Sequence, residues 1–274
     1  MSEGLHPYQR VSARDAGAAQ AAPASLSAVS LPEETPVAVV YNGSTQAVMM
    51  ATPADIEDFA RGFTITEGFA EAQEIGEVEI VEQPNGIEAR IWLPDEKQAA
   101  LDARRRAQVG PVGCGLCGID SLAQAARTVR AVPASDLVLA PSEIAVALHA
   151  LRTLQPLHDE TRAVHAAGFY IPGQGIVLAR EDVGRHNALD KLAGAMAATG
   201  VDPASGAVVL TSRLSLEMVQ KTAMIGAPVM LSVSQPTAHA VRLAEEAGIA
   251  LVTHNRQGTR IFTHHARIGA AHVL

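Results

Sequence analysis

Short apolar runs separated by turn residues predict two β-hairpins in the first half of the chain. The expected strands are Thr35–Tyr41 and Thr45–Met50 in one hairpin and Val78–Val81 and Ile87–Leu93 in the other. Asn42-Gly43, between the first two runs, is a strong turn signal because both residues tolerate a positive φ. Between the hairpins, apolar residues at helical spacing predict a helix with Thr52 as N-cap and Pro53 as its first residue. We therefore expect a small α+β domain over residues 32–112.

From residue 142 onward the chain alternates strand-like and helix-like segments. Apolar runs predict strands at 163–171, 175–179, 207–211, 229–232, 249–253 and 260–264, and helical spacing predicts helices at 142–154, 187–199, 215–225 and 238–247. This alternation is typical of α/β domains in which helices cover both faces of a partly parallel sheet. We expect such a three-layer domain, able to bind a cofactor, over residues 142–274. Residues 113–141 are expected to form a Cys-x-x-Cys loop, a helix and a connector.

Composition and charge narrow the class of protein. Of the 274 residues 48% are hydrophobic but only 3% are aromatic, so we expect an aliphatic core. A net charge of -8 offers no general attraction for nucleic acid. Residues 1–31 are rich in Ala and Ser and contain no apolar run long enough for a signal peptide or a membrane span. We therefore expect a disordered N-terminal arm over residues 1–31, a cytoplasmic location and no membrane association.

The two cysteines, Cys114 and Cys117, lie in the sequence Val-Gly-Cys-Gly-Leu-Cys-Gly. In a reducing compartment such a pair is more often reactive or metal-binding than a structural disulfide. The glycines leave both sulfur atoms unshielded, and the arginines at 104–106 would lower the thiol pKa if they lie close by. A zinc half-site, a thioredoxin-like dithiol and a buried structural pair are alternatives, although a second cysteine pair for zinc is absent. The sequence favours a persulfide carrier, which needs one accessible thiolate on a mobile support.

Polar segments follow three of the predicted strands in the second half. They are Arg180–Asn187, Thr211–Arg213 and Ser234–Thr237. Because ligands bind at the carboxyl ends of strands in α/β sheets, and because Arg185 and a helix N-terminus are suited to phosphate, we expect a shared pocket there. Glu217, Gln220 and Lys221 are either one face of a helix beside that pocket or a solvated helix face. His254–Arg260 is either a nucleotide-binding loop or a hairpin turn. Adenine-nucleotide enzymes have no support, since neither a Walker A nor a Gly-x-Gly-x-x-Gly motif is present.

A set of motifs is spread over residues 32–268. They are Asn42-Gly43, Met49-Met-Ala-Thr-Pro53, Gly62-Phe63, Thr66-Glu-Gly68, Cys114-Gly-Leu-Cys-Gly118, Glu181-Asp-Val-Gly-Arg-His-Asn-Ala-Leu-Asp-Lys191, Ser212-Arg213, Glu217-Met-Val-Gln-Lys221 and Ser234-Gln-Pro-Thr237. The combination closely resembles the formate dehydrogenase accessory sulfurtransferases, the FdhD family. The resemblance implies a homodimer with a cytidine-deaminase-like α/β domain and no intrinsic metal. It also implies that a cysteine desulfurase supplies sulfur as a persulfide. The recipient would be the molybdenum bis(molybdopterin guanine dinucleotide) cofactor, which formate dehydrogenase needs in sulfurated form.

The resemblance also implies roles for individual residues. Cys114 would carry the persulfide and Cys117 would assist its release. The nucleotide-contacting segment of the family matches Asn255, Arg256, Gln257, Gly258, Thr259 and Arg260. The remaining expected cofactor-binding residues, at the strand ends, are Arg185, His186, Ser212 and Arg213. Two other functions stay open: a chaperone that only shelters the molybdenum cofactor, and a dithiol oxidoreductase.

Overall fold

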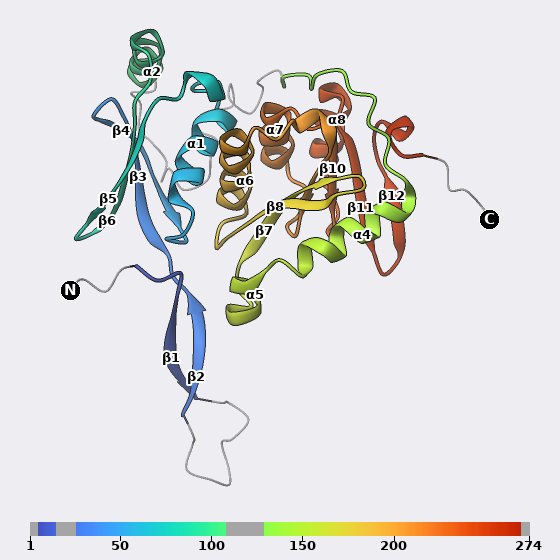
Figure 1. The fold of residues 1–274 in the computed structure, drawn as a ribbon, viewed down its shortest axis with the longest axis horizontal. Helices are drawn as coiled ribbons and strands as arrows, with labels where there is room; N and C mark the ends of the chain where they lie inside the picture. The colour runs from blue at the N-terminus through green and yellow to red at the C-terminus, as the bar shows by residue number, and fades with distance from the viewer. Residues whose placement is uncertain (1–4, 15–25, 108–128, 270–274) are drawn as a thin grey trace.

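The computed structural model describes residues 5–14, 26–107 and 129–269, and Figure 1 shows two β-sheets separated by helices. A four-stranded sheet from the first half of the chain lies on one side, and a six-stranded sheet from the second half lies on the other. Helices α1 (Ile56–Thr66) and α6 (Arg185–Thr199) pack against each other between the two sheets. The mixed α/β class expected from the sequence is confirmed.

The four-stranded sheet combines the two predicted hairpins. Its strands are β3 (Thr35–Tyr41), β4 (Ser44–Ala51), β5 (Val78–Gln83) and β6 (Gly86–Ile91), in the order β4-β3-β6-β5. Asn42 and Gly43 both take the positive φ that the tight turn between β3 and β4 requires. One face of the sheet packs on α1, with Val39 and Phe59 in the same buried cluster. A short 3₁₀ turn (Ala72–Glu74) precedes β5, and helix α2 (Asp95–Ala107) follows β6.

The six-stranded sheet lies between two layers of helices, as predicted. Its strands are β7 (His165–Ile171), β8 (Gly175–Asp182), β9 (Ala207–Leu210), β10 (Val229–Ser232), β11 (Ala250–Asn255) and β12 (Gly258–Ile261), in the order β12-β11-β10-β9-β7-β8. The parallel strands are β9, β10 and β11. Helix α6, with α7 (Leu216–Ile225) and α8 (Ala238–Ala247), covers one face, and α4 (Pro141–Arg152) covers the other. The short helix α5 (Pro156–Thr161) was not expected from the sequence.

The predicted start of α1 is wrong. The helix begins at Ile56, and its N-cap is Asp55 in a left-handed conformation with φ 53°. Thr52 does not cap the helix, because its backbone N–H and its hydroxyl are bonded to Asp182 and Val183 in the second half of the chain. A Thr-Pro pair before a helical pattern looks like a helix cap in sequence, but here the polar groups of the threonine bond to a distant segment and not to the helix.

The expectation of a disordered N-terminal arm is wrong for two segments. Strands β1 (Tyr8–Arg14) and β2 (Leu26–Pro32) form an antiparallel ribbon that projects from the rest of the molecule (Figure 1). Ser30 donates a hydrogen bond to Glu160 of α5, which ties the ribbon to the second half of the chain. The Ala/Ser-rich composition concealed the alternating apolar positions that let these strands pair.

Helices α1 and α6 approach until their backbones touch. A Cβ atom added to Gly62 of α1 would lie 1.6 Å from the carbonyl oxygen of Asp190, and one added to Gly194 of α6 would lie 1.9 Å from that of Asp58. Both glycines are therefore needed for this contact, which joins the two sheets into one body. Within the described ranges no helix is both long and apolar enough to cross a membrane.

Candidate functional site

The carboxyl ends of β9 and β10 meet at one edge of the six-stranded sheet, and the polar segments after them lie side by side. The Ser232 hydroxyl donates to the carbonyl oxygen of Ser212 at 2.6 Å. The backbone N–H of Thr237 donates to the carbonyl of Leu214 at 3.1 Å. The predicted proximity of segments 211–213 and 234–237 is confirmed.

The end of β8 reaches the same edge through β7, which lies between β8 and β9. Asp182, the last residue of β8, is paired in register with His165 at the start of β7. The next residue of β7, Ala166, donates its backbone N–H to the Thr211 hydroxyl at 2.9 Å. All three polar segments predicted from the sequence therefore gather at this edge, which we call the strand-end site.

Asp182 is completely buried and its carboxylate accepts four hydrogen bonds. Oδ1 accepts from the backbone N–H of Gly184 at 2.8 Å and from Nδ2 of Asn187 at 3.0 Å. Oδ2 accepts from the backbone N–H of Thr52 at 3.0 Å and lies 2.7 Å from the Lys191 ammonium group. Since a carboxylate offers about four acceptor positions, Asp182 has no capacity left for a ligand.

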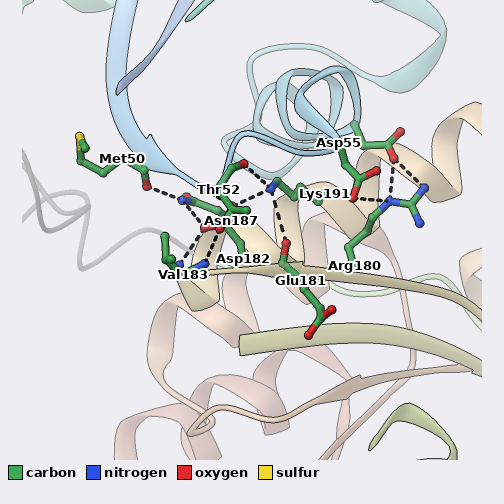
Figure 2. Close-up of polar contacts among 11 residues, drawn as sticks. Met50, Thr52, Asp55, Arg180, Glu181, Asp182, Val183, Asn187 and Lys191 are labelled. Carbon is green, nitrogen blue, oxygen red and sulfur yellow. Dashed lines mark hydrogen bonds and ion pairs between the residues drawn. The ribbon is translucent and has the colours of Figure 1, made fainter. Parts of the chain in front are cut away.

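Lys191 is the other half of this buried ion pair. Its side chain is 0% exposed, and Figure 2 shows it reaching from α6 toward the segment that follows β4. Besides Asp182 it donates to the carbonyl oxygens of Thr52 at 2.9 Å and Glu181 at 3.5 Å. Three acceptors match the three protons of an ammonium group, so Lys191 is a structural residue.

Thr52 places all three of its polar groups on the β8–α6 segment (Figure 2). Its N–H donates to Asp182, its carbonyl accepts from Lys191, and its hydroxyl accepts from the backbone N–H of Val183 at 3.1 Å. Nearby, Nδ2 of Asn187 donates to the carbonyl of Met50 at 2.8 Å. We call these residues the Thr52 cluster: Met50, Thr52, Asp182, Val183, Asn187 and Lys191.

A second buried group of charges includes Asp190, the neighbour of Lys191 in α6. The Lys221 ammonium group lies 2.8 Å from Oδ1 of Asp190 and 2.7 Å from Oε1 of Glu67, and it donates to the Thr66 hydroxyl at 3.0 Å. Lys221 is buried among these partners, so the interpretation of a solvated helix face is wrong for this residue. Its charge joins α7 to α1 and α6.

Arg185 and His186 occupy the first turn of α6, and they differ from the other polar residues of their motif. The Nε atom of Arg185 and the Nε2 atom of His186 are buried and have no hydrogen-bond partner among the described residues. The N-cap residue of α6 is Gly184, so no side chain caps this helix end. Buried nitrogens beside an uncapped helix N-terminus are suited to hydrogen-bond acceptors on an anionic ligand. These two residues therefore differ from Asp182, Asn187 and Lys191, whose polar groups are bonded within the fold.

His186 is held in its neutral form. Burial, together with the positive charges of Arg185 and Lys221, lowers the pKa of its imidazole to about 4. Nε2 lies 4.0 Å from a carboxylate oxygen of Glu217, which accepts a hydrogen bond from the Ser215 hydroxyl at 2.7 Å. A neutral imidazole presents one donor and one acceptor, so His186 can bind a ligand without adding a charge.

The other predicted strand-end residues, Ser212 and Arg213, differ in exposure. Ser212 is buried, and its carbonyl is bonded to Ser232. Arg213 is exposed, so its guanidinium is accessible to solvent at this edge. The structure thus brings Arg185, His186 and Ser212 to one edge of the sheet and leaves Arg213 on its surface.

The predicted nucleotide-contacting residues, Asn255–Arg260, form the turn and second strand of the β11–β12 hairpin. Their hydrogen bonds are local. Oδ1 of Asn255 accepts from the backbone N–H of Gln257 at 2.9 Å, and the Arg260 guanidinium donates to Gln257 at 3.2 Å. Arg256, Gln257, Thr259 and Arg260 are exposed, and Gly258 has φ 101°. The hairpin extends from the same edge as the strand-end site, because β11 is parallel to β9 and β10.

Cys114 and Cys117 lie outside the described residues. In the described part of the chain, no group of three or more His, Cys, Asp or Glu side chains is arranged to hold a metal ion. The role of Thr52 in the site was missed from the sequence. Glu217, which the sequence offered as a wall of the pocket, does lie near His186. Ser215 is the N-cap of α7 and Glu217 lies in its first turn, so both are near the strand end, but only the fold shows that α6 lies opposite.

Comparisons with known proteins agree with this architecture. The family model described as the FdhD/NarQ family matches residues 32–269. A protein of Agrobacterium fabrum named sulfur carrier protein FdhD is 52% identical over 240 residues, which cover 87% of this chain and 89% of that protein. A Cupriavidus necator protein of the same name is 48% identical over 241 residues, covering 88% of this chain and 83% of that protein.

A solved structure is also similar. It is described as a formate dehydrogenase accessory protein from Desulfotalea psychrophila, and the TM-score is 0.72 at 26% identity, covering 97% of this chain and all of that one. The family match spans both sheets, the Cys-x-x-Cys segment and the strand-end site. The chain therefore belongs to the FdhD/NarQ family.

Proposed function

We propose that this protein is a sulfurtransferase that carries sulfur as a persulfide on Cys114. The sulfur is transferred to a molybdenum bis(molybdopterin guanine dinucleotide) cofactor, which formate dehydrogenase requires in its sulfurated form. The observation that carries the proposal is the match to relatives named sulfur carrier protein across 87% of the chain. The strand-end site adds support, because Arg185 and His186 offer buried nitrogen atoms to an anionic group. The molybdenum cofactor is the substrate of this reaction.

The proposed sulfur transfer proceeds in two steps. The Cys114 thiolate attacks the terminal sulfur of a cysteine desulfurase persulfide, which forms a Cys114 persulfide and releases the desulfurase thiolate. The Cys117 thiolate then attacks the Cys114 sulfur, which releases hydrosulfide as the ligand of molybdenum and leaves a Cys114–Cys117 disulfide. A thiol reductant supplies the two electrons that restore both thiols.

The strand-end site and the β11–β12 hairpin divide the binding of the cofactor in this proposal. Arg185, His186, Ser212 and Arg213 would contact the phosphates of a guanine dinucleotide end. Residues Asn255–Arg260 would contact the nucleotide from the neighbouring hairpin. We further propose a cytoplasmic homodimer whose second domain is cytidine-deaminase-like, with formate dehydrogenase as the recipient.

Mass spectrometry tests the sulfur-carrying step. After incubation with a cysteine desulfurase and cysteine, the Cys114 peptide of the wild-type protein should gain the mass of one sulfur atom. Cys114→Ala should gain none, and Cys117→Ala should retain the persulfide but fail to activate formate dehydrogenase. Full activation by Cys117→Ala would overturn the second step.

A chaperone that only shelters the cofactor is the competing function. It predicts that Cys114→Ala still activates formate dehydrogenase in cells that lack the wild-type protein. The sulfurtransferase predicts that this variant still binds cofactor but leaves formate dehydrogenase inactive. A dithiol oxidoreductase would instead turn over small disulfides, a reaction that neither of the other two functions requires.

A further inference from the structure

The Thr52 cluster connects two distant parts of the chain at a position next to the strand-end site. Thr52 follows β4 of the first sheet, whereas its partners Asp182, Val183 and Lys191 belong to β8, the loop after it and α6. Arg185 and His186 lie within this span of partners. A displacement of Thr52 would therefore pull on the start of α6, which carries both residues.

The cluster itself is closed to ligands. Asp182 and Lys191 are 0% exposed and their hydrogen-bonding capacity is used within the cluster. Thr52 is also 0% exposed. Its effect on a ligand can therefore act only through the geometry of the residues that it holds.

The cluster fixes the first turn of α6 at its backbone. The N–H groups of Val183 and Gly184, immediately before the helix, are bonded to Thr52 and Asp182 at 3.1 Å and 2.8 Å. Asn187, one residue after His186, is bonded to Met50 and Asp182. Arg185 and His186 are thus held on both sides by residues that the cluster fixes.

We propose that Thr52 is a positioning residue, which sets the orientation of Arg185 and His186 at the strand-end site from the end of β4. Buried ion pairs are weak evidence for stability, because well-packed apolar residues can replace them without loss. A buried polar cluster of this kind instead specifies one arrangement of backbone donors and acceptors. The consequence is that the first sheet takes part in ligand binding without touching the ligand, an inference that rests on the proposed binding role of Arg185 and His186.

A matched pair of variants separates positioning from general stability. Thr52→Val removes the hydroxyl that accepts from Val183. Thr64→Val removes an equally buried hydroxyl in α1, whose partners are Tyr41 and Ala60 within the first half of the chain. Both variants remove the hydroxyl of a fully buried threonine together with its hydrogen bonds, but only the first touches the β8–α6 segment. Thr52→Ser keeps the hydroxyl and is the conservative rescue.

The first measurement does not require a ligand. Amide hydrogen exchange of Val183 should accelerate by about tenfold or more in Thr52→Val, and the imidazole resonances of His186 should shift. Neither should change in Thr64→Val beyond the uniform effect of its lower stability, and Thr52→Ser should match the wild-type protein. Equal exchange at Val183 in the two valine variants would overturn the proposal.

The second measurement links position to binding, with guanosine diphosphate as the probe for the nucleotide ends of the cofactor. In isothermal titration calorimetry, Thr52→Val should weaken binding by roughly 5- to 10-fold, and Thr64→Val by less than about twofold. If His186→Ala weakens binding and Thr52→Val does not, positioning is wrong and the proposed site stands. If the wild-type protein and His186→Ala bind alike, the proposed site is wrong, and hydrogen exchange alone then decides whether Thr52 positions the turn.

Discussion

The β8–α6 segment and the β11–β12 hairpin were both predicted to bind cofactor, but they are held in place in opposite ways. Polar groups of the first bond to residues more than a hundred positions away, such as Asp182 to Thr52 and Asn187 to Met50. Those of the hairpin bond within a few positions, as His254 does to Thr259 at 2.8 Å. The first segment therefore has its geometry imposed by the fold, whereas the exposed side chains of the hairpin can adjust to a ligand.

The largest expected effect comes from leaving one buried charge without its partner. Lys191→Met should lower the free energy of unfolding by about 3–5 kcal/mol, because Asp182 keeps a buried charge that nothing neutralises. The double variant Lys191→Met/Asp182→Asn should recover much of that loss. Urea denaturation measures both, and a cost below about 1 kcal/mol for the single variant would show that the cluster does not impose the geometry of the segment.

A smaller effect should follow from pH. The pKa of His186 is lowered to about 4 in the folded protein. At a pH between that value and the ordinary histidine pKa of about 6.5, the unfolded chain binds a proton that the folded protein does not. Because protonation favours the unfolded chain, the free energy of unfolding falls as pH falls from about 6.5 to about 4. The loss amounts to roughly 2 kcal/mol after a discount for the partial exposure of His186. His186→Gln should lose that much less stability than the wild-type protein between pH 7 and pH 4. Parallel stability curves would contradict the prediction.

The smallest effects are expected in the hairpin. Arg256→Ala should change the free energy of unfolding by less than about 0.5 kcal/mol, because Arg256 is exposed. Asn255→Ala should cost about 1 kcal/mol, since it removes the acceptor for the backbone N–H of Gln257. Thermal denaturation measures both. If Arg256→Ala nevertheless weakens guanosine diphosphate binding several-fold, the hairpin acts in binding and not in stability, which sharpens its contrast with the β8–α6 segment.

The elements predicted correctly from the sequence are those set by local chemistry. Asn42-Gly43 specifies the turn between β3 and β4 because the turn requires a positive φ at two consecutive residues, which Asn and Gly tolerate. The strands and helices after residue 163 follow from apolar spacing, which depends on near neighbours. The Cys-x-x-Cys assignment and the homodimer stay predictions.

The division of labour within the Glu181–Lys191 motif could not be predicted from the sequence. Asp182, Asp190 and Lys191 are charged, and charged side chains are usually exposed, so their burial shows only once Thr52 and Lys221 are placed beside them. Thr52 itself resembled a helix cap. In each case a contact between distant segments overrides a local preference, either the exposure of a charged side chain or the capping of a helix. No local sequence pattern encodes such a contact.

The sequence separations within the Thr52 cluster also set an order of events during synthesis. The bonds from Thr52 reach partners 130, 131 and 139 positions further along the chain. Contacts of such high contact order form late in folding, after local hairpins and helices. A nascent chain that stops before α6 has a complete first sheet but lacks Asn187 and Lys191, the cluster residues that α6 supplies. Arg185 and His186 consequently reach their arrangement at the strand-end site only after α6 has been translated and has packed on α1, so incomplete chains lack the folded strand-end site.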